Sequence, residues 1–178
     1  MPKKETSEPG VIPGQVLDPQ LRDYLEVMST AVFQAGLRWA AIAKTWDAYV
    51  VAFDAFEPLK VASYTEFDVE RLMETPRVLH SAKKIRATIH NAQTLLALDR
   101  ERGGFQHYLR SFENYDAFSK DFRKRFKFMG EMNVWYFLFR VNEPVPEFEH
   151  WVTTIQGDHP RMKEMVEKGR KAGTSREY

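Results

Sequence analysis

The apolar residues of this chain recur at intervals of three and four, a spacing that places them along one face of a helix. The pattern is clearest in three stretches: Leu21, Tyr24, Leu25 and Met28; Ile85, Ile89, Ala92 and Leu96; and Val134, Phe137, Leu138 and Val141. No stretch shows a comparable alternation of apolar and polar residues, which is the pattern of a half-buried strand. The sequence therefore predicts an all-α protein built from several short helices.

Local signals for helix ends agree with this prediction. Thr65 is followed three residues later by Asp68, a spacing typical of a capping box in which each side chain accepts from a backbone amide. Pro58, Pro76 and Pro144 mark breaks in the chain, because proline does not continue a helix.

Length and composition predict one domain. The 178 residues are 43% hydrophobic, which is enough for one core of ordinary size and too few for two. Residues 1–16 and 169–178 show no apolar period, so we expect mobile tails around a single helical domain at 17–168. The chain has no cysteine, which excludes disulfides and removes the usual thiolate ligands of structural zinc.

Hydropathy gives an expectation about location. No apolar run approaches the roughly 18 to 20 residues that cross a bilayer, and residues 1–16 lack the apolar core of a signal peptide. We therefore expect a cytoplasmic protein with no membrane partner. The formal net charge is +1, so any affinity for nucleic acid depends on where the basic residues lie.

One basic segment, residues 119–130, ends a helical pattern and precedes the next at Val134, which predicts a helix-hairpin-helix. Backbone amides that open a helix lack intrahelical partners, and a DNA phosphate can accept from them. Gly130 lets a backbone approach closely. The expected DNA contacts of the segment are Lys120, Lys124, Arg125, Lys127, Phe128 and Gly130, with Arg123 beside them. The alternative is a solvated basic helix face.

A second basic stretch, residues 77–86, leads into a long helical pattern. Lys83 and Lys84 predict a second contact with the DNA backbone. The alternative is that Lys83 and His80 only solvate the start of a helix, since surface lysine needs no special explanation.

Two runs resemble a known family. Gln34, Ala35, Gly36, Leu37 and Trp39 match the signature of the DNA-3-methyladenine glycosylase I family, and seven residues between Ser119 and Gly130 match its hairpin. The resemblance implies a base excision repair fold that rotates a damaged purine out of the duplex. Ala31 stands where the family carries its pocket glutamate, and the two cysteines of the family's zinc site are missing. We therefore expect no metal and no cofactor.

The resemblance also implies roles in base binding. Trp39 occupies the family's stacking position, where an indole face favours a cationic methylated purine. Gln34 is expected to hydrogen-bond a base edge, although it could as easily tie down a helix end. Further aromatic candidates, more often core residues, are Trp46, Tyr49, Trp135 and Tyr136.

The wider superfamily places its catalytic carboxylate about twenty residues past the hairpin. The resemblance suggests Glu149 as the catalytic acid, with Glu147 as runner-up. The alternative is that both are surface acids at the start of a helix.

The resulting expectation is a monomeric DNA glycosylase-like protein that acts on duplex DNA with an alkylated purine. It would hydrolyse the N-glycosidic bond without cutting the strand. The alternative is a damaged-DNA-binding protein that has lost the family's glutamate and zinc site. A helical interaction domain with no DNA role is the third interpretation.

Overall fold

The computed structural model describes residues 14–155, and this part of the chain is helical throughout with no β-strand, as the sequence predicts. Residues 1–13 and 156–178 lie outside the described range, together with most of both predicted tails and the predicted domain end at 168. The helices are α1 (Leu21–Gln34), α2 (Trp39–Ala43), α3 (Trp46–Ala52), α4 (Pro58–Ala62), α5 (Glu66–Met73), α6 (Ala82–Arg102), α7 (Phe105–Leu109), α8 (Tyr115–Arg125), α9 (Glu131–Arg140) and α10 (Phe148–Trp151), with 3-10 turns at Asp54–Phe56 and Val152–Thr154.

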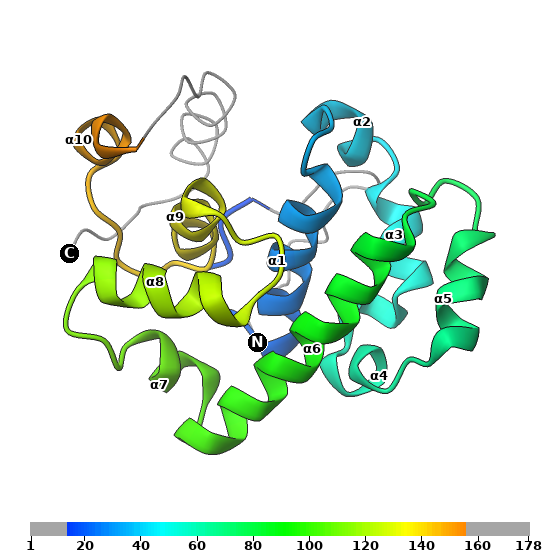
Figure 1. Ribbon diagram of the computed structural model, residues 1–178, viewed down its shortest axis with the longest axis horizontal. Coiled ribbons are helices and arrows are strands. Elements are labelled where there is room, and N and C mark those ends of the chain that lie inside the picture. Colours follow the sequence, from blue (N-terminus) through cyan, green and yellow to red (C-terminus); the bar gives the residue numbers. More distant parts are fainter. Residues whose placement is uncertain (1–13, 156–178) are drawn as a thin grey trace.

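Two helices organise the molecule. Figure 1 shows α6 running diagonally in front of α1, with α2 to α5 on one side and α7 to α10 on the other. Each side has its own hydrophobic core, and both α1 and α6 contribute residues to both cores. The core on the α2–α5 side receives Leu25, Phe33, Ile85, Ile89 and Ala92 from these two helices, and the core on the α7–α10 side receives Tyr24, Val27, Met28, Ala31, Leu95 and Leu98.

Side-chain caps define where several helices begin. The predicted capping box at Thr65 and Asp68 is present at the start of α5. Ser81 accepts from the amide of Lys84 at the start of α6, which ends at Gly103 in the left-handed conformation with φ +67°. Glycine suits this C-cap because it has no Cβ to clash.

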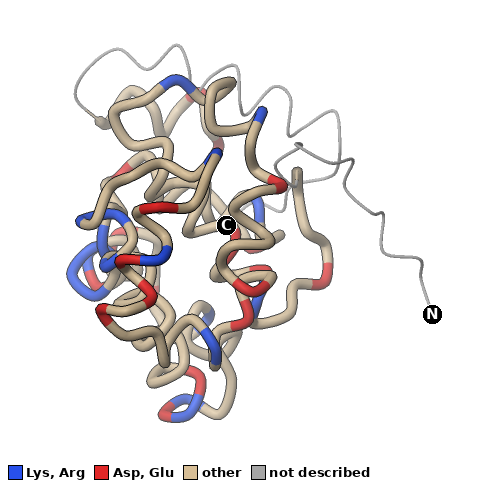
Figure 2. Tube along the Cα trace, turned by 90° about the vertical axis from the view of Figure 1, so that its right-hand side faces the viewer, with Lys and Arg blue, Asp and Glu red and all other residues tan. Residues whose placement is uncertain are grey.

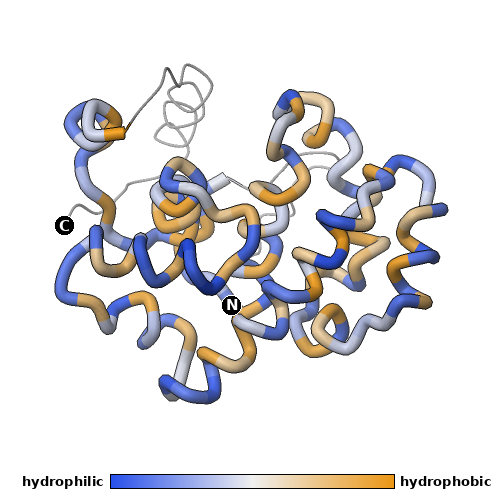
Figure 3. The backbone as a smooth tube through the Cα atoms, viewed as in Figure 1, coloured by the Kyte–Doolittle hydropathy of each residue, from blue (hydrophilic) through white to orange (hydrophobic). Residues whose placement is uncertain are grey.

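Hydropathy changes sharply between α8 and α9. In Figure 3 the largely hydrophilic tube of α8 gives way to the largely hydrophobic tube of α9. The residues of α9 from Val134 to Arg140 are all buried, so this helix forms the centre of the α7–α10 side. Along residues 14–155 no helix combines the length and the apolar character needed to cross a membrane.

Residues 14–16, which the sequence assigns to the N-terminal tail, pair with the end of α9. The amide of Val16 donates to the carbonyl of Arg140 at 2.7 Å, and the side chain of Gln15 donates to the carbonyl of Phe139 at 3.1 Å. These bonds attach the chain just ahead of α1 to the centre of the fold.

Candidate functional site

The basic segment forms two helices joined by a tight turn. Between the end of α8 at Arg125 and the start of α9 at Glu131, Phe128 takes the left-handed conformation with φ +59°. Gly130 is extended, with φ −77°, so its conformation does not require glycine. A Cβ at this position would meet no atom within 4 Å, and no side chain caps α9. The first amides of α9 can therefore be reached by an anion.

The turn is clamped to α6. The Asn91 side chain donates to the carbonyl of Lys127 at 3.2 Å and accepts from its amide at 2.8 Å. His90 Nε2 lies 3.1 Å from the carbonyl oxygen of Arg125. On the α9 side, Asn133 donates to the carbonyl of Phe128 at 2.9 Å. The backbone of the turn is thus fixed from two helices before any ligand binds.

The basic side chains of the hairpin differ in how far they are already paired. Arg125 donates to Asp121 at 2.7 Å, and Arg123 lies 3.5 Å from Glu131. Burial raises the pKa of Asp121, but the hydrogen bonds from Arg125 and Tyr108 outweigh it and hold this pKa below its usual value. By contrast, the exposed ammonium groups of three lysines form no ion pair with a carboxylate in residues 14–155: Lys120, Lys124 and Lys127.

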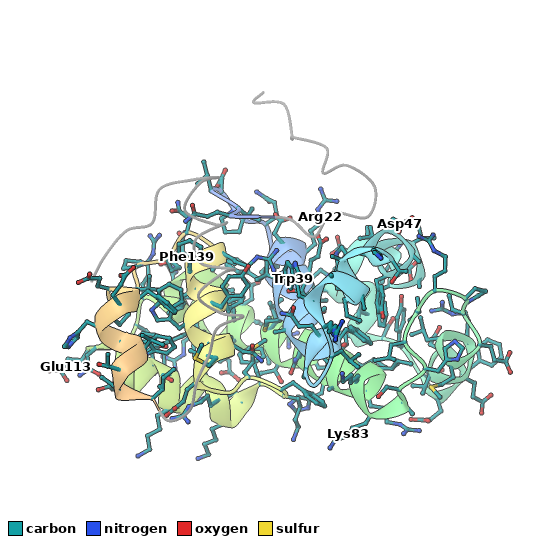
Figure 4. The ribbon with its side chains drawn as sticks, turned by 90° about the horizontal axis from the view of Figure 1, so that it is seen from above. Arg22, Trp39, Asp47, Lys83, Glu113 and Phe139 are labelled. Carbon is teal, nitrogen blue, oxygen red and sulfur yellow. The ribbon has the colours of Figure 1, made fainter. Side chains whose placement is uncertain are left out.

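A hollow of about 670 Å³ lies between the turn and the start of α6. Its lining is Lys83, Arg86, Ala87, His90, Lys127 and Phe128. The Lys83 ammonium lies 5.7 Å from the centre of the Phe128 ring. Figure 4 shows Lys83 at the edge of the molecule that faces the viewer in Figure 1, and Figure 2 shows several Lys and Arg positions along the same edge. The hollow therefore joins the two predicted basic stretches into one cationic surface.

Lys84 lies apart from this surface. Its ammonium donates to the carbonyls of Phe33 at 3.0 Å and Ala35 at 2.6 Å, and burial lowers its pKa. It therefore satisfies carbonyl groups at the C-terminal end of α1. Because its donors are engaged there, we omit Lys84 from the proposed DNA contacts, although the sequence placed it among them.

The predicted stacking residue, Trp39, is the first residue of α2 and is half-buried. Its ring meets Tyr136 of α9 edge-on, with centroids 6.5 Å apart and an interplanar angle of 79°. The other three aromatic candidates are nearly fully buried: Trp46 stacks on Tyr49, and Trp135 stacks on Phe139 and Trp151. Tyr136, itself 7% exposed, is the candidate whose ring lies beside Trp39. In the view from above of Figure 4, Trp39 lies near the middle of the outline and Lys83 at its edge, and Figure 1 shows α2 at the top of the fold.

Gln34 ends α1 close in sequence to Trp39. It is 9% exposed, and its Oε1 accepts no hydrogen bond from the described residues. An unpaired buried oxygen is costly, so a ligand that donates to it would be favoured.

The two positions predicted to decide the chemistry lie on different helices. Ala31 is buried on α1 and belongs to the core on the α7–α10 side. Glu149 is exposed on α10, with Glu147 at the N-cap of the same helix. In Figure 1, α10 lies on the far side of α9 from α2. The structure does not bring Glu149 together with Trp39.

The residues do not fit the family's zinc site. The chain has no cysteine, and the described residues contain no group of three or more His, Asp or Glu side chains able to hold a metal ion. Residues 14–155 therefore do not rebuild that site from other ligands.

Sequence reasoning missed a buried polar cluster between α1 and α9. The guanidinium of Arg140, 1% exposed, donates to Thr30 Oγ1 at 2.8 Å and lies 5.5 Å from the centre of the Tyr136 ring. Glu26 accepts from the indole N–H of Trp46 at 2.9 Å. The available signal was a charged residue inside an apolar helical pattern, which both Glu26 and Arg140 provide.

Fold and site together define an all-α protein with a cationic helical hairpin and an aromatic pair between α2 and α9. The chain belongs to the methyladenine glycosylase family, whose model matches residues 16–132. The DNA-3-methyladenine glycosylase 1 of Escherichia coli is 34% identical over 118 residues, which are 54% of this chain and 63% of that protein. The chain thus spans less than two thirds of this relative. The Haemophilus influenzae DNA-3-methyladenine glycosylase is 29% identical over 126 residues, or 68% of its length.

Solved structures agree with this assignment. A structure of 3-methyladenine DNA glycosylase I from Staphylococcus aureus has a TM-score of 0.62 at 30% identity, covering 73% of this chain and 79% of that one. A single-substitution variant of a 3-methyladenine DNA glycosylase I, solved in complex with 3-methyladenine, has the same TM-score at 31% identity and covers 72% and 80% of the two chains.

Proposed function

We propose that this protein binds duplex DNA, rotates an alkylated purine of the 3-methyladenine type out of the stack and hydrolyses its N-glycosidic bond. The observation that carries the proposal is the edge-on pair of Trp39 and Tyr136, set in a member of this family with a cationic hairpin. In this proposal the protein acts as a monomer in the cytoplasm and uses no cofactor.

The DNA backbone would lie along the cationic surface. In this proposal Lys83, Lys120, Lys124 and Lys127 neutralise phosphates, while the open first turn of α9 beyond Gly130 donates amides to one phosphate. Arg125 and Phe128 shape the turn that presents these groups. Contacts of this kind carry no base information, so selection of the lesion falls to the aromatic pair.

Charge distinguishes the damaged base from its neighbours. A purine methylated at a ring nitrogen is a cation in DNA, and an indole face attracts a desolvated cation by roughly 0.5 to 2 kcal/mol. The proposed role of Trp39 is to stack on this base, and that of Gln34 is to accept from its exocyclic amine with the unpaired Oε1. Adenine, which is neutral, gains only the ordinary stacking energy.

The proposed reaction needs little help with its leaving group. When the C1′–N bond breaks, the electron pair passes to the purine and cancels its positive charge. Water adds to C1′, and its proton passes to solvent.

The second candidate function, a damaged-DNA-binding protein without catalysis, is favoured by one observation, the apolar Ala31 at the family's acid position.

Base release separates the two functions. The protein is incubated with methylated duplex DNA, and released bases are measured by chromatography while affinity for the same duplex is measured by fluorescence anisotropy. The proposal expects 3-methyladenine to be released by the wild type and not by Trp39→Ala, with Trp39→Phe intermediate. Tight binding of methylated DNA without release would establish the non-catalytic alternative.

A further inference from the structure

The hollow between the hairpin turn and α6 combines positive charge with an aromatic wall. Its fully charged side chains come from two elements, Lys83 and Arg86 from α6 and Lys127 from the turn. Phe128 contributes a ring and Ala87 a methyl group to the same lining. Its volume of about 670 Å³ falls within the range of roughly 300 to 1,000 Å³ that is typical of small-ligand sites. A nucleotide, which joins a flat base to a phosphate, has the size and the chemistry that suit this lining.

Phe128 is placed to receive a base rather than to insert between base pairs. An inserting side chain projects from the surface, whereas Phe128 is half-buried and lines the hollow. The backbone of the turn is fixed around it, by Asn91 at Lys127 and by Asn133 at the carbonyl of Phe128. A base therefore has to enter the hollow to reach this ring. In a paired duplex the faces of the bases are stacked on one another, so only an unpaired base can do so.

The two lysines of the hollow are available to a phosphate. Neither Lys83 nor Lys127 forms an ion pair with a carboxylate in residues 14–155. The Lys83 ammonium lies 5.7 Å from the centre of the Phe128 ring, a contact that is weak at an exposed site and that a phosphate can replace. Arg86, by contrast, already donates two hydrogen bonds to Glu66. Within the part of the chain that the structure describes, the hollow thus offers two lysines beside one ring.

We propose that this hollow binds one unpaired nucleotide of a DNA strand, with its base stacked against Phe128 and its flanking phosphates at Lys83 and Lys127. Proteins that bind single strands combine the same two elements, a positively charged groove and an aromatic ring on which a base stacks. The hollow is part of the cationic surface, so the strand that enters it is an overhang or a gap beside the bound duplex. This inference rests on the proposed binding of DNA and does not depend on base release.

The test separates the unpaired base from its phosphates. Two unmethylated duplexes carry a short overhang of the same length, made of thymidine residues in one and of abasic residues in the other. Both overhangs have the same phosphates, so the ratio of the two dissociation constants, measured by fluorescence anisotropy at one salt concentration, reports the base alone. We expect the wild type to bind the thymidine overhang about tenfold more tightly than the abasic one.

Substitutions at the ring assign the effect to the hollow. Phe128→Leu keeps an apolar side chain and should abolish the difference between the two overhangs, whereas Phe128→Trp should retain it, because an indole also stacks on a base. Phe67→Leu is the matched control: Phe67 is an exposed ring on α5 outside the hollow, and its loss should leave the ratio at the wild-type value. Lys83→Ala should instead weaken the binding of both overhangs and reduce the salt dependence of each. Thermal unfolding followed by circular dichroism shows that each variant is folded at the temperature of the binding assay.

Equal affinity of the wild type for the two overhangs would overturn the role of the hollow alone, since neither duplex is methylated and base release is not measured. A difference that Phe128→Leu retains would also overturn it, and loss of that difference in Trp39→Ala would then place the unpaired base at Trp39. Failure of the wild type to bind either duplex would refute the proposed binding of DNA and this inference with it.

Discussion

The anchoring of the hairpin by Asn91 makes a quantitative prediction. Asn91 is 1% exposed, and its amide makes two hydrogen bonds to the backbone of Lys127. Each bond contributes roughly 0.5 to 1.5 kcal/mol, and leaving both backbone groups of Lys127 unpaired adds to the loss. Asn91→Ala should therefore lower the free energy of unfolding by about 2 to 4 kcal/mol. The affinity for duplex DNA should fall as well, because the turn that presents the basic side chains loses its attachment to α6.

Urea unfolding followed by circular dichroism measures the first effect, with an unchanged m-value indicating that the same surface is exposed. Gln93→Ala is the matched control, since Gln93 is an exposed residue of the same helix with one hydrogen bond, to the carbonyl of Ala62. It should change stability by less than about 1 kcal/mol. The anchoring role of Asn91 is wrong if Asn91→Ala costs no more than Gln93→Ala, or if stability falls while DNA affinity at a temperature well below unfolding is unchanged.

Two further substitutions test the cationic surface, and a third tests whether Lys84 lies outside it. Lys124→Ala should weaken DNA binding and reduce the slope of log affinity against log salt by about 0.9, and an unchanged slope would remove Lys124 from the interface. Glu66→Gln weakens the hold on Arg86, which now makes two hydrogen bonds of 2.7 and 3.1 Å to Glu66, and should tighten DNA binding several-fold with little change in stability. Lys84→Met should lower the free energy of unfolding by about 1 to 3 kcal/mol in urea titrations and leave DNA affinity unchanged; lost affinity without lost stability would return Lys84 to the interface.

Local patterns predicted much of the fold. The helical periods, the capping box at Thr65 and the pair of helices around the basic segment depend on residues within a few positions of one another, which sequence reasoning can compare directly. The matching signatures likewise identified the family, because each lies in one short run.

The features that could not be predicted from the sequence depend on contacts between residues far apart in the chain. The bonds from Lys84 to the end of α1 and from Asn91 to the hairpin join residues 36 to 51 positions apart. The distance of Glu149 from the hairpin along the sequence suggested it as the catalytic acid. However, its helix α10 lies on the far side of α9 from α2, the helix that Trp39 begins.

Release of a cationic base by a protein without the family's glutamate is the step on which the proposed function depends. It is measured as the single-turnover rate of 3-methyladenine release from methylated duplex DNA at neutral pH, with protein in excess. We expect release by the wild type well above the spontaneous rate, and a rate close to spontaneous for Trp39→Ala, although that variant still binds DNA. A wild-type rate equal to the spontaneous rate, or an undiminished rate in Trp39→Ala, would show that this protein does not release the base by stacking on Trp39.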